Sequence, residues 1–300
     1  MKNNLKKYVA VIFLFIVVLS GCGGSGNDSD KQDSDIVLAE SYDEKPGDRF
    51  TRSATISAIY SDGQTAELNS VEESVYSQIT EIPTKYNYSN ADGGPYLLET
   101  TNEEGILSGL DYNTQSGDSI IDDDLEYYTS IEYTTVEGSE DPENISVGDN
   151  YSYYQNSTLF NSNTGDEAGY NIENYEYSVL SEEEITVPAG TFNSVKIGFS
   201  VSQKELENDI IDTSTGTGYI WIDTTNGFML KMVIVEGNLT INEYNITASF
   251  SGEVLLQSYD LASTKSSKIS SQKSLSNYGI KNTSIIFALK KEIRNIRKSI

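Results

Sequence analysis

Apolar and polar residues alternate along most of the chain from about residue 50, which is the pattern of half-buried β-strands. Residues 52–60 and 244–254 both show this alternation. It is strictest where one face carries Val195, Ile197, Phe199 and Val201. Residues 219–222 are apolar on both faces, which favours a central strand, and 223–227 have the composition of a turn. The pattern predicts a mainly β, antiparallel domain over 49–263.

The first half of this domain is less regular. Residues 71–82 fit a helix face as well as a strand, and we favour a strand. Residues 96–101 and 106–112, joined by Asn-Glu-Glu-Gly, predict a hairpin. The polar loop 137–150 then separates two groups of predicted strands. It is a candidate boundary between two halves of the domain.

The start of the chain has a different pattern. An uncharged apolar run covers residues 8–19 and follows three lysines, Lys2, Lys6 and Lys7. This run is shorter than the roughly 20 apolar residues that a membrane-spanning helix needs. It has the composition of a signal-peptide core, so residues 1–21 are predicted to be a signal peptide.

The tetrad Leu19-Ser20-Gly21-Cys22 closes this run and resembles the bacterial lipobox. The resemblance implies cleavage before Cys22 and attachment of a diacylglyceryl group, with palmitate-type acyl chains, to its thiol. Two or three acyl chains bind a membrane almost permanently, at about 0.8 kcal/mol per buried CH₂. The alternative is an ordinary secretory signal followed by an incidental cysteine. Cys22 is the one cysteine in the sequence, so disulfides are excluded.

In residues 22–48, Cys22 is followed by a run rich in Gly, Ser, Asn and Asp without large apolar residues, which predicts a flexible acidic tether. Gly23 occupies the position where aspartate signals inner-membrane retention in Gram-negative lipoproteins. The lipobox resemblance therefore implies the outer membrane in a Gram-negative host. In other hosts it implies the outer face of the cytoplasmic membrane.

Charge is divided sharply along the chain, whose formal net charge is −26. Residues 23–263 hold 8 basic and 45 acidic residues, whereas 264–300 hold 9 basic residues and one acid, Glu292. Such an acidic body repels nucleic acid and anionic surfaces. We therefore expect no nucleic-acid partner.

Histidine is absent from the chain, which excludes Ser-His-Asp triads and HExxH metal sites. We identify no catalytic residues, no metal site and no cofactor, and we expect a protein that is not an enzyme. A pair of carboxylates is sufficient for glycoside hydrolysis, so a polysaccharide hydrolase remains an alternative.

Three segments of the second half resemble known envelope proteins. Residues 221–231, WIDTTNGFMLK, resemble a hairpin of the lipoprotein-carrier superfamily, which includes the lipoprotein-localisation factors. Residues 187–192, VPAGTF, and 147–149, VGD, resemble elements of uncharacterised envelope proteins thought to share that fold. The resemblance implies a curled, half-barrel-like antiparallel sheet whose concave side is able to hold acyl chains. Trp221 and Phe228 would then face the ligand, although both also suit an ordinary core.

The basic tail, 264–300, contains a predicted amphipathic helix over about 284–299. Its apolar stripe is formed by Ile286, Leu289, Ile293, Ile296 and Ile300. The basic positions beside this stripe are Lys290, Lys291, Arg294, Arg297 and Lys298. These residues suit contact with anionic lipid. Docking on the acidic body, or a tail with no selected role, are the alternatives.

The sequence thus predicts a membrane-anchored envelope lipoprotein of non-enzymatic type that binds a lipid, a polymer or a partner protein. A carboxylate-dependent hydrolase is one alternative. An adhesin-like surface protein is another, because tyrosine, with 21 residues, and small polar residues are abundant.

Overall fold

A computed structural model describes residues 46–78, 96–102, 107–113, 119–122, 127–130, 137–138, 146–161, 163–207, 210–242 and 245–262. Cys22, most of the predicted tether and the basic tail with its predicted helix lie outside these residues. No helix in the described ranges is long and apolar enough to cross a membrane.

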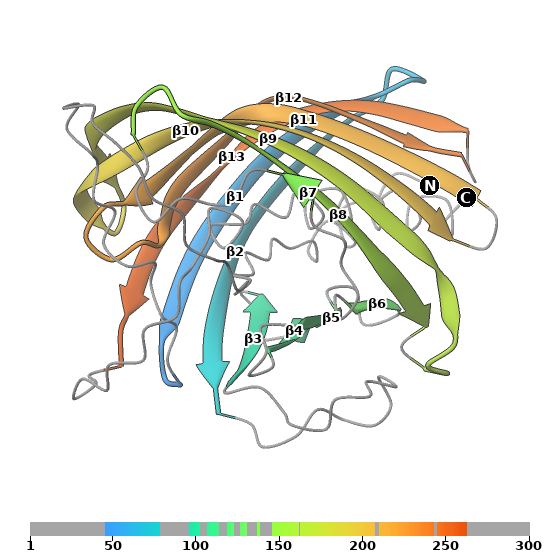
Figure 1. Ribbon diagram of the computed structural model, residues 1–300, viewed down its shortest axis with the longest axis horizontal. Helices are drawn as coiled ribbons and strands as arrows, with labels where there is room; N and C mark the ends of the chain where they lie inside the picture. Colours follow the sequence, from blue (N-terminus) through green and yellow to red (C-terminus); the bar gives the residue numbers. More distant parts are fainter. Residues whose placement is uncertain are drawn as a thin grey trace, which may run out of the picture.

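All regular structure in the described part of the chain is β-strand (Figure 1). The strands are β1 Arg49–Tyr60, β2 Thr65–Ser77, β3 Tyr96–Asn102, β4 Leu107–Asn113, β5 Ser119–Asp122, β6 Tyr127–Ser130, β7 Glu137–Gly138, β8 Asn150–Asn161, β9 Glu167–Val187, β10 Gly190–Glu207, β11 Ile210–Asp223, β12 Met229–Ile241 and β13 Ile246–Asp260. The prediction of a mainly β domain is confirmed, as are the hairpin of β3 with β4 and the strand within 71–82.

The strands form one antiparallel sheet in the order β6-β5-β4-β3-β2-β1-β13-β12-β11-β10-β9-β8-β7. Strands β8 to β13 follow one another as a meander, and β1 pairs with β13, which brings the first strand beside the last. A short additional pairing joins β6 to β8. The long strands make an arch and the short strands β3 to β6 lie opposite it (Figure 1). The sheet is therefore strongly curled, as predicted, and strands from both sides of the predicted boundary at 137–150 belong to it. Two residues that were predicted to lie in a loop there, Glu137 and Gly138, form β7.

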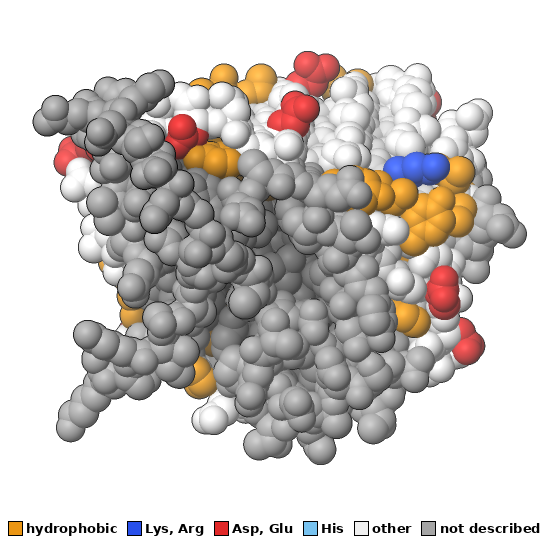
Figure 2. Space-filling view, viewed as in Figure 1, with side chains coloured by type: hydrophobic (Ala, Val, Ile, Leu, Met, Phe, Trp, Pro, Cys, Tyr) orange, Lys and Arg blue, Asp and Glu red, His pale blue; other side chains and the backbone are white. Residues whose placement is uncertain are grey.

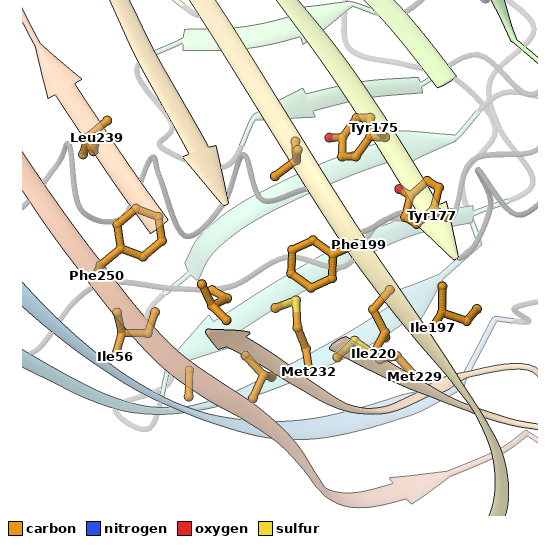
Figure 3. Close-up of a cluster of buried hydrophobic side chains, with 14 of the residues drawn as sticks. Ile56, Tyr175, Tyr177, Ile197, Phe199, Ile220, Met229, Met232, Leu239 and Phe250 are labelled. Carbon is orange, nitrogen blue, oxygen red and sulfur yellow. The ribbon is translucent and has the colours of Figure 1, made fainter. Parts of the chain in front are cut away.

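Alternation along the strands decides which side chains are buried. On β10, the residues Val195, Ile197, Phe199 and Val201 are buried, whereas Ser202 and Lys204 on the other face are exposed. Equivalent positions on β1, β9, β11, β12 and β13 join them in one hydrophobic cluster (Figure 3). These positions make up the concave face of the arch, and the exposed positions make up its convex face.

Two phenylalanine rings of this cluster lie over glycines of the neighbouring strand. A Cβ atom at Gly218 would lie 2.9 Å from the Phe199 ring, and a Cβ atom at Gly237 would overlap the Phe250 ring. A side chain at Gly237 would therefore displace the ring, and one at Gly218 would also meet the Val233 carbonyl oxygen. Both glycines allow the strands and rings of a curved sheet to approach closely.

We predict that Gly237→Ala lowers the free energy of unfolding by about 1–3 kcal/mol, because the added methyl group overpacks the site against Phe250. Urea unfolding of the variant measures the effect. The matched control is Gly198→Ala on the convex face, where the new Cβ would make an ordinary contact, 3.4 Å from Leu180 Cδ1. Equal stability of the two variants would contradict the account.

Candidate functional site

One end of the concave face is polar. Eight polar side chains, each at most 6% exposed, lie there on the four neighbouring strands β8 to β11. They form two cross-strand rows, called here the polar rows. The first row is Gln155, Glu173, Gln203 and Ser214, and the second is Ser157, Asn171, Glu205 and Asp212.

The polar rows continue the same alternation that builds the apolar core. On β10, the concave positions after Val201 are Gln203 and Glu205. On β11, Asp212 and Ser214 precede the concave residues Ile220 and Ile222. On β10 and β11 the concave face therefore changes from apolar to polar while side chains keep alternating between the two faces, whereas Leu239 and Ile241 keep the same end of β12 apolar.

Hydrogen bonds connect the polar rows into a chain of donors that ends on a carboxylate. Ser214 Oγ donates to Gln203 Oε1 (3.1 Å), and Gln203 Nε2 donates to Asn171 Oδ1 (2.9 Å). Asn171 Nδ2 then donates to Glu173 Oε1 (2.9 Å), and Tyr175 donates its hydroxyl to Glu173 Oε2 (3.0 Å). Each link polarises the next, so the chain strengthens the bonds to Glu173. This network fixes the orientation of both amides.

The second row brings two carboxyl groups together. Glu205 and Asp212 lie directly opposite each other in the register and are 2% and 6% exposed. Asp212 accepts the backbone N–H of Asn242 (2.9 Å). Like charges in this arrangement repel, and burial of a carboxylate is unfavourable without compensating donors. The polar rows therefore favour hydrogen-bond donors or a positive charge over an anion. No group of three or more acidic or cysteine side chains in the described ranges has the geometry to hold a metal ion.

Trp221 and Phe228 lie at the opposite end of the sheet from the polar rows. They are 8% and 6% exposed and belong to a second cluster with Phe50, Tyr76, Val187, Leu230 and Leu256. The Phe228 ring packs edge-on against Phe50, with centroids 5.6 Å apart. By alternation Trp221 points to the convex face, where its Nε1 donates to Glu183 Oε1. Their contact with a ligand stays a prediction.

The motifs that resemble carrier proteins shape turns and strand ends. Asp223 accepts the N–H of Thr225 (3.0 Å) and the amide of Asn226 (2.7 Å), and Gly227 closes this turn with a φ of 75°. Residues 187–190 turn β9 into β10. Asp149 accepts the N–H of Ser146 (2.7 Å) at the start of β8. The motif acids therefore have structural partners.

Sequence reasoning missed the polar rows. Every second residue of a strand faces the same side, so Gln203 lies on the same face as Val201. A polar residue on the apolar face was the signal available in the sequence. Cys22, Lys290, Lys291, Arg294, Arg297 and Lys298 lie outside the described residues.

We predict that Gln203→Leu lowers the free energy of unfolding by about 1–3 kcal/mol, because the buried Asn171 oxygen and Ser214 hydroxyl both lose this partner. Thermal and urea unfolding measure the loss. The neighbouring change Lys204→Leu, at an exposed position on the convex face, should alter stability by less than about 0.5 kcal/mol. If both variants unfolded like the parent chain, the network would have no role in stability.

The comparisons with known proteins give two similar structures. No family model matches the chain, and no curated protein matches it. A Bacteroides fragilis structure, described as an exported protein with a YmcC-like fold, is 13% identical, covers 74% of this chain and 99% of its own, and has a TM-score of 0.35. A Parabacteroides distasonis structure, described as a lipoprotein, is 16% identical, covers 76% of this chain and 100% of its own, and has a TM-score of 0.33. At these scores the two similarities carry no conclusion about this chain.

Proposed function

We propose that the chain is a non-enzymatic envelope lipoprotein whose β domain binds an amphiphilic lipid. The observation that carries this proposal is the division of the concave face into an apolar stretch and a polar end. An acyl chain would lie along the apolar stretch. Its head group would meet the polar rows.

The dimensions of the concave face suit an acyl chain. A strand rises about 3.3 Å per residue, so the apolar run from Val195 to Val201 spans roughly 20 Å. Each methylene buried against such a face contributes about 0.8 kcal/mol. Phe199 and Ile220 of this stretch are 5% and 1% exposed, so an acyl chain would take the place of protein groups that cover them. Apolar burial therefore supplies affinity, and the polar rows supply the orientation of the ligand.

The polar rows also explain why a lipid suits this face better than a hydrophilic polymer. A polymer of hydroxylated units needs polar partners along its whole length, whereas the buried positions Val195, Ile197, Phe199 and Val201 of β10 offer none. Glu173 and Asp212 accept hydrogen bonds there, which favours a head group with hydroxyl or amine donors. A lipid with such a head group matches both parts of the face.

Lipid binding is tested with a fluorescently labelled long-chain fatty amine and a matched pair of variants. We predict that Val201→Trp, which fills the concave face, weakens binding at least tenfold, whereas Ser200→Trp on the convex face leaves it unchanged. Far-ultraviolet circular dichroism checks that both variants fold. If the parent chain fails to bind the probe, or if the two variants bind it equally, the proposal is wrong.

The anchor is tested separately. We predict that Cys22→Ala moves the protein from the membrane fraction to the soluble fraction of its host, because the acyl chains that hold it are lost. Cell fractionation followed by immunoblotting measures the change. A Ser20→Ala variant keeps a small residue before the cysteine and is the control. Retention of the Cys22→Ala protein on the membrane would contradict anchoring through this residue.

A further inference from the structure

The chain enters and leaves the sheet at one corner, formed by Gly47, Asp48 and Ala262 and called here the tether corner. A Cβ atom at Gly47 would lie 3.3 Å from Ala262 Cβ. The buried carboxylate of Asp48 accepts the backbone N–H of Ala262 (2.7 Å). The start of β1 also lies directly opposite the end of β13 (Figure 1). The predicted tether therefore reaches the domain at the point where the basic tail, 264–300, leaves it.

The tether corner lies at the opposite end of the sheet from the polar rows. Tyr60, at the far end of β1, lies opposite Ala248, which lies opposite Leu239. Leu239 lies opposite Ser214, and Ser214 lies opposite Gln203 of the polar rows. At about 3.3 Å per residue, the 12 residues of β1 span roughly 35 Å. Both predicted connections to the membrane therefore leave from the end that is far from the polar rows.

The basic tail has the composition of a segment that binds an anionic surface. Residues 264–300 hold 9 basic residues and one acid, whereas 23–263 hold 8 basic and 45 acidic residues. The helix predicted over about 284–299 has an apolar stripe with basic residues beside it, which is the pattern of helices that lie in a membrane interface. An anionic lipid surface offers both partners at once, because the apolar stripe enters the acyl boundary while the basic side chains meet the head groups.

Acidic groups on the domain itself are a competing partner for the basic tail. In the view of Figure 2, acidic side chains are scattered over the described surface and do not gather in one patch. The consecutive exposed residues Glu182, Glu183 and Glu184 on β9 point alternately to opposite sides of the strand. Attraction to the domain is therefore spread over its surface. We favour the membrane as the partner, and docking on the domain is an outcome of the test.

We propose that residues 264–300 bind the anionic head-group surface beside the lipid anchor, so that the tether corner faces the membrane and the polar rows face away from it. The proposal rests on the proposed anchor at Cys22, which holds the tail at high local concentration near the lipid. A flexible segment as long as 263–283 reaches about 25 Å on average, so the tail can meet the membrane while the anchor holds. Repulsion between the acidic body and the same surface keeps the rest of the domain at a distance.

The tail contact is tested on the lipidated protein, in which the thioether at Cys22 leaves an introduced cysteine as the one free thiol. Ala288→Cys, within the predicted helix, carries an environment-sensitive fluorophore. The vesicles contain either equal parts of phosphatidylglycerol and phosphatidylethanolamine or phosphatidylcholine alone. We expect emission at least twofold higher in the anionic vesicles than in the neutral ones, because only the anionic surface binds the tail.

A charge variant and a control variant show whether the basic side chains cause this difference. A basic residue close to an anionic leaflet strengthens binding by roughly fivefold, so loss of five should release the tail. Lys204→Gln, on the exposed convex face of β10, should keep the full rise in emission. The variant that should lose the rise is Lys290→Gln/Lys291→Gln/Arg294→Gln/Arg297→Gln/Lys298→Gln.

The orientation is tested by energy transfer from a donor dye on the domain to an acceptor lipid in the anionic vesicles. Thr225→Cys places the dye in the turn between β11 and β12, at the same end of the sheet as the tether corner. Gln64→Cys places it in the turn between β1 and β2, at the end with the polar rows. Both positions are exposed. We expect stronger transfer from position 225, and a smaller difference in the fivefold glutamine variant.

Sedimentation of the vesicles separates this proposal from that of the anchor. Protein that pellets with both kinds of vesicle and shows equal emission in them would keep the anchor and overturn the tail contact, as docking of the tail on the domain would. Protein that pellets with the anionic vesicles alone would support the tail contact and overturn the anchor. Failure to pellet with either would overturn both. Equal transfer from the two dye positions would overturn the orientation.

Discussion

The hydrogen-bonded register between β9, β10 and β11 is the constraint on which the rest of the structure depends. Because side chains alternate between the faces of a strand, a slip of one residue would exchange the concave and convex sets completely. The observed register places Val201 inside with Tyr175, and it places Gln203 between Glu173 and Ser214. The apolar core and the polar rows are therefore two consequences of one ladder.

The two ends of the concave face differ in what stabilises them. Over the apolar stretch, burial and close contact of rings with glycines hold the strands together, as where Phe250 lies over Gly237. At the polar end, buried side chains remain tolerable because each amide in the chain from Ser214 to Glu173 has a defined partner. The described structure thus keeps a connected polar network inside, where a wholly apolar set of side chains would also suit a buried face. The presence of this polar network at a buried position is the physical reason for assigning the polar end to function.

The sequence was sufficient to predict strands with strict alternation, such as 195–201, and the turn over 223–227, since their signals are local. It also predicted a curled antiparallel sheet through a resemblance in turn motifs. It did not predict the polar rows, because the neighbours of Glu205 depend on pairings with Asn171 and Asp212 that no local pattern specifies. The pairing of β1 with β13 likewise joins residues about two hundred positions apart. The place of Trp221, between Lys196 and Lys231 of the neighbouring strands, followed only from the register.

The account depends most on the claim that the concave face holds a lipid with its head group at the polar rows. A crystal structure of the protein purified from its own membrane, without delipidation, tests this claim most directly. We predict acyl-chain density along Phe199 and Val201, with a donor group within hydrogen-bond distance of Glu173 or Asp212. A concave face filled by protein side chains alone, without ligand density, would contradict the account.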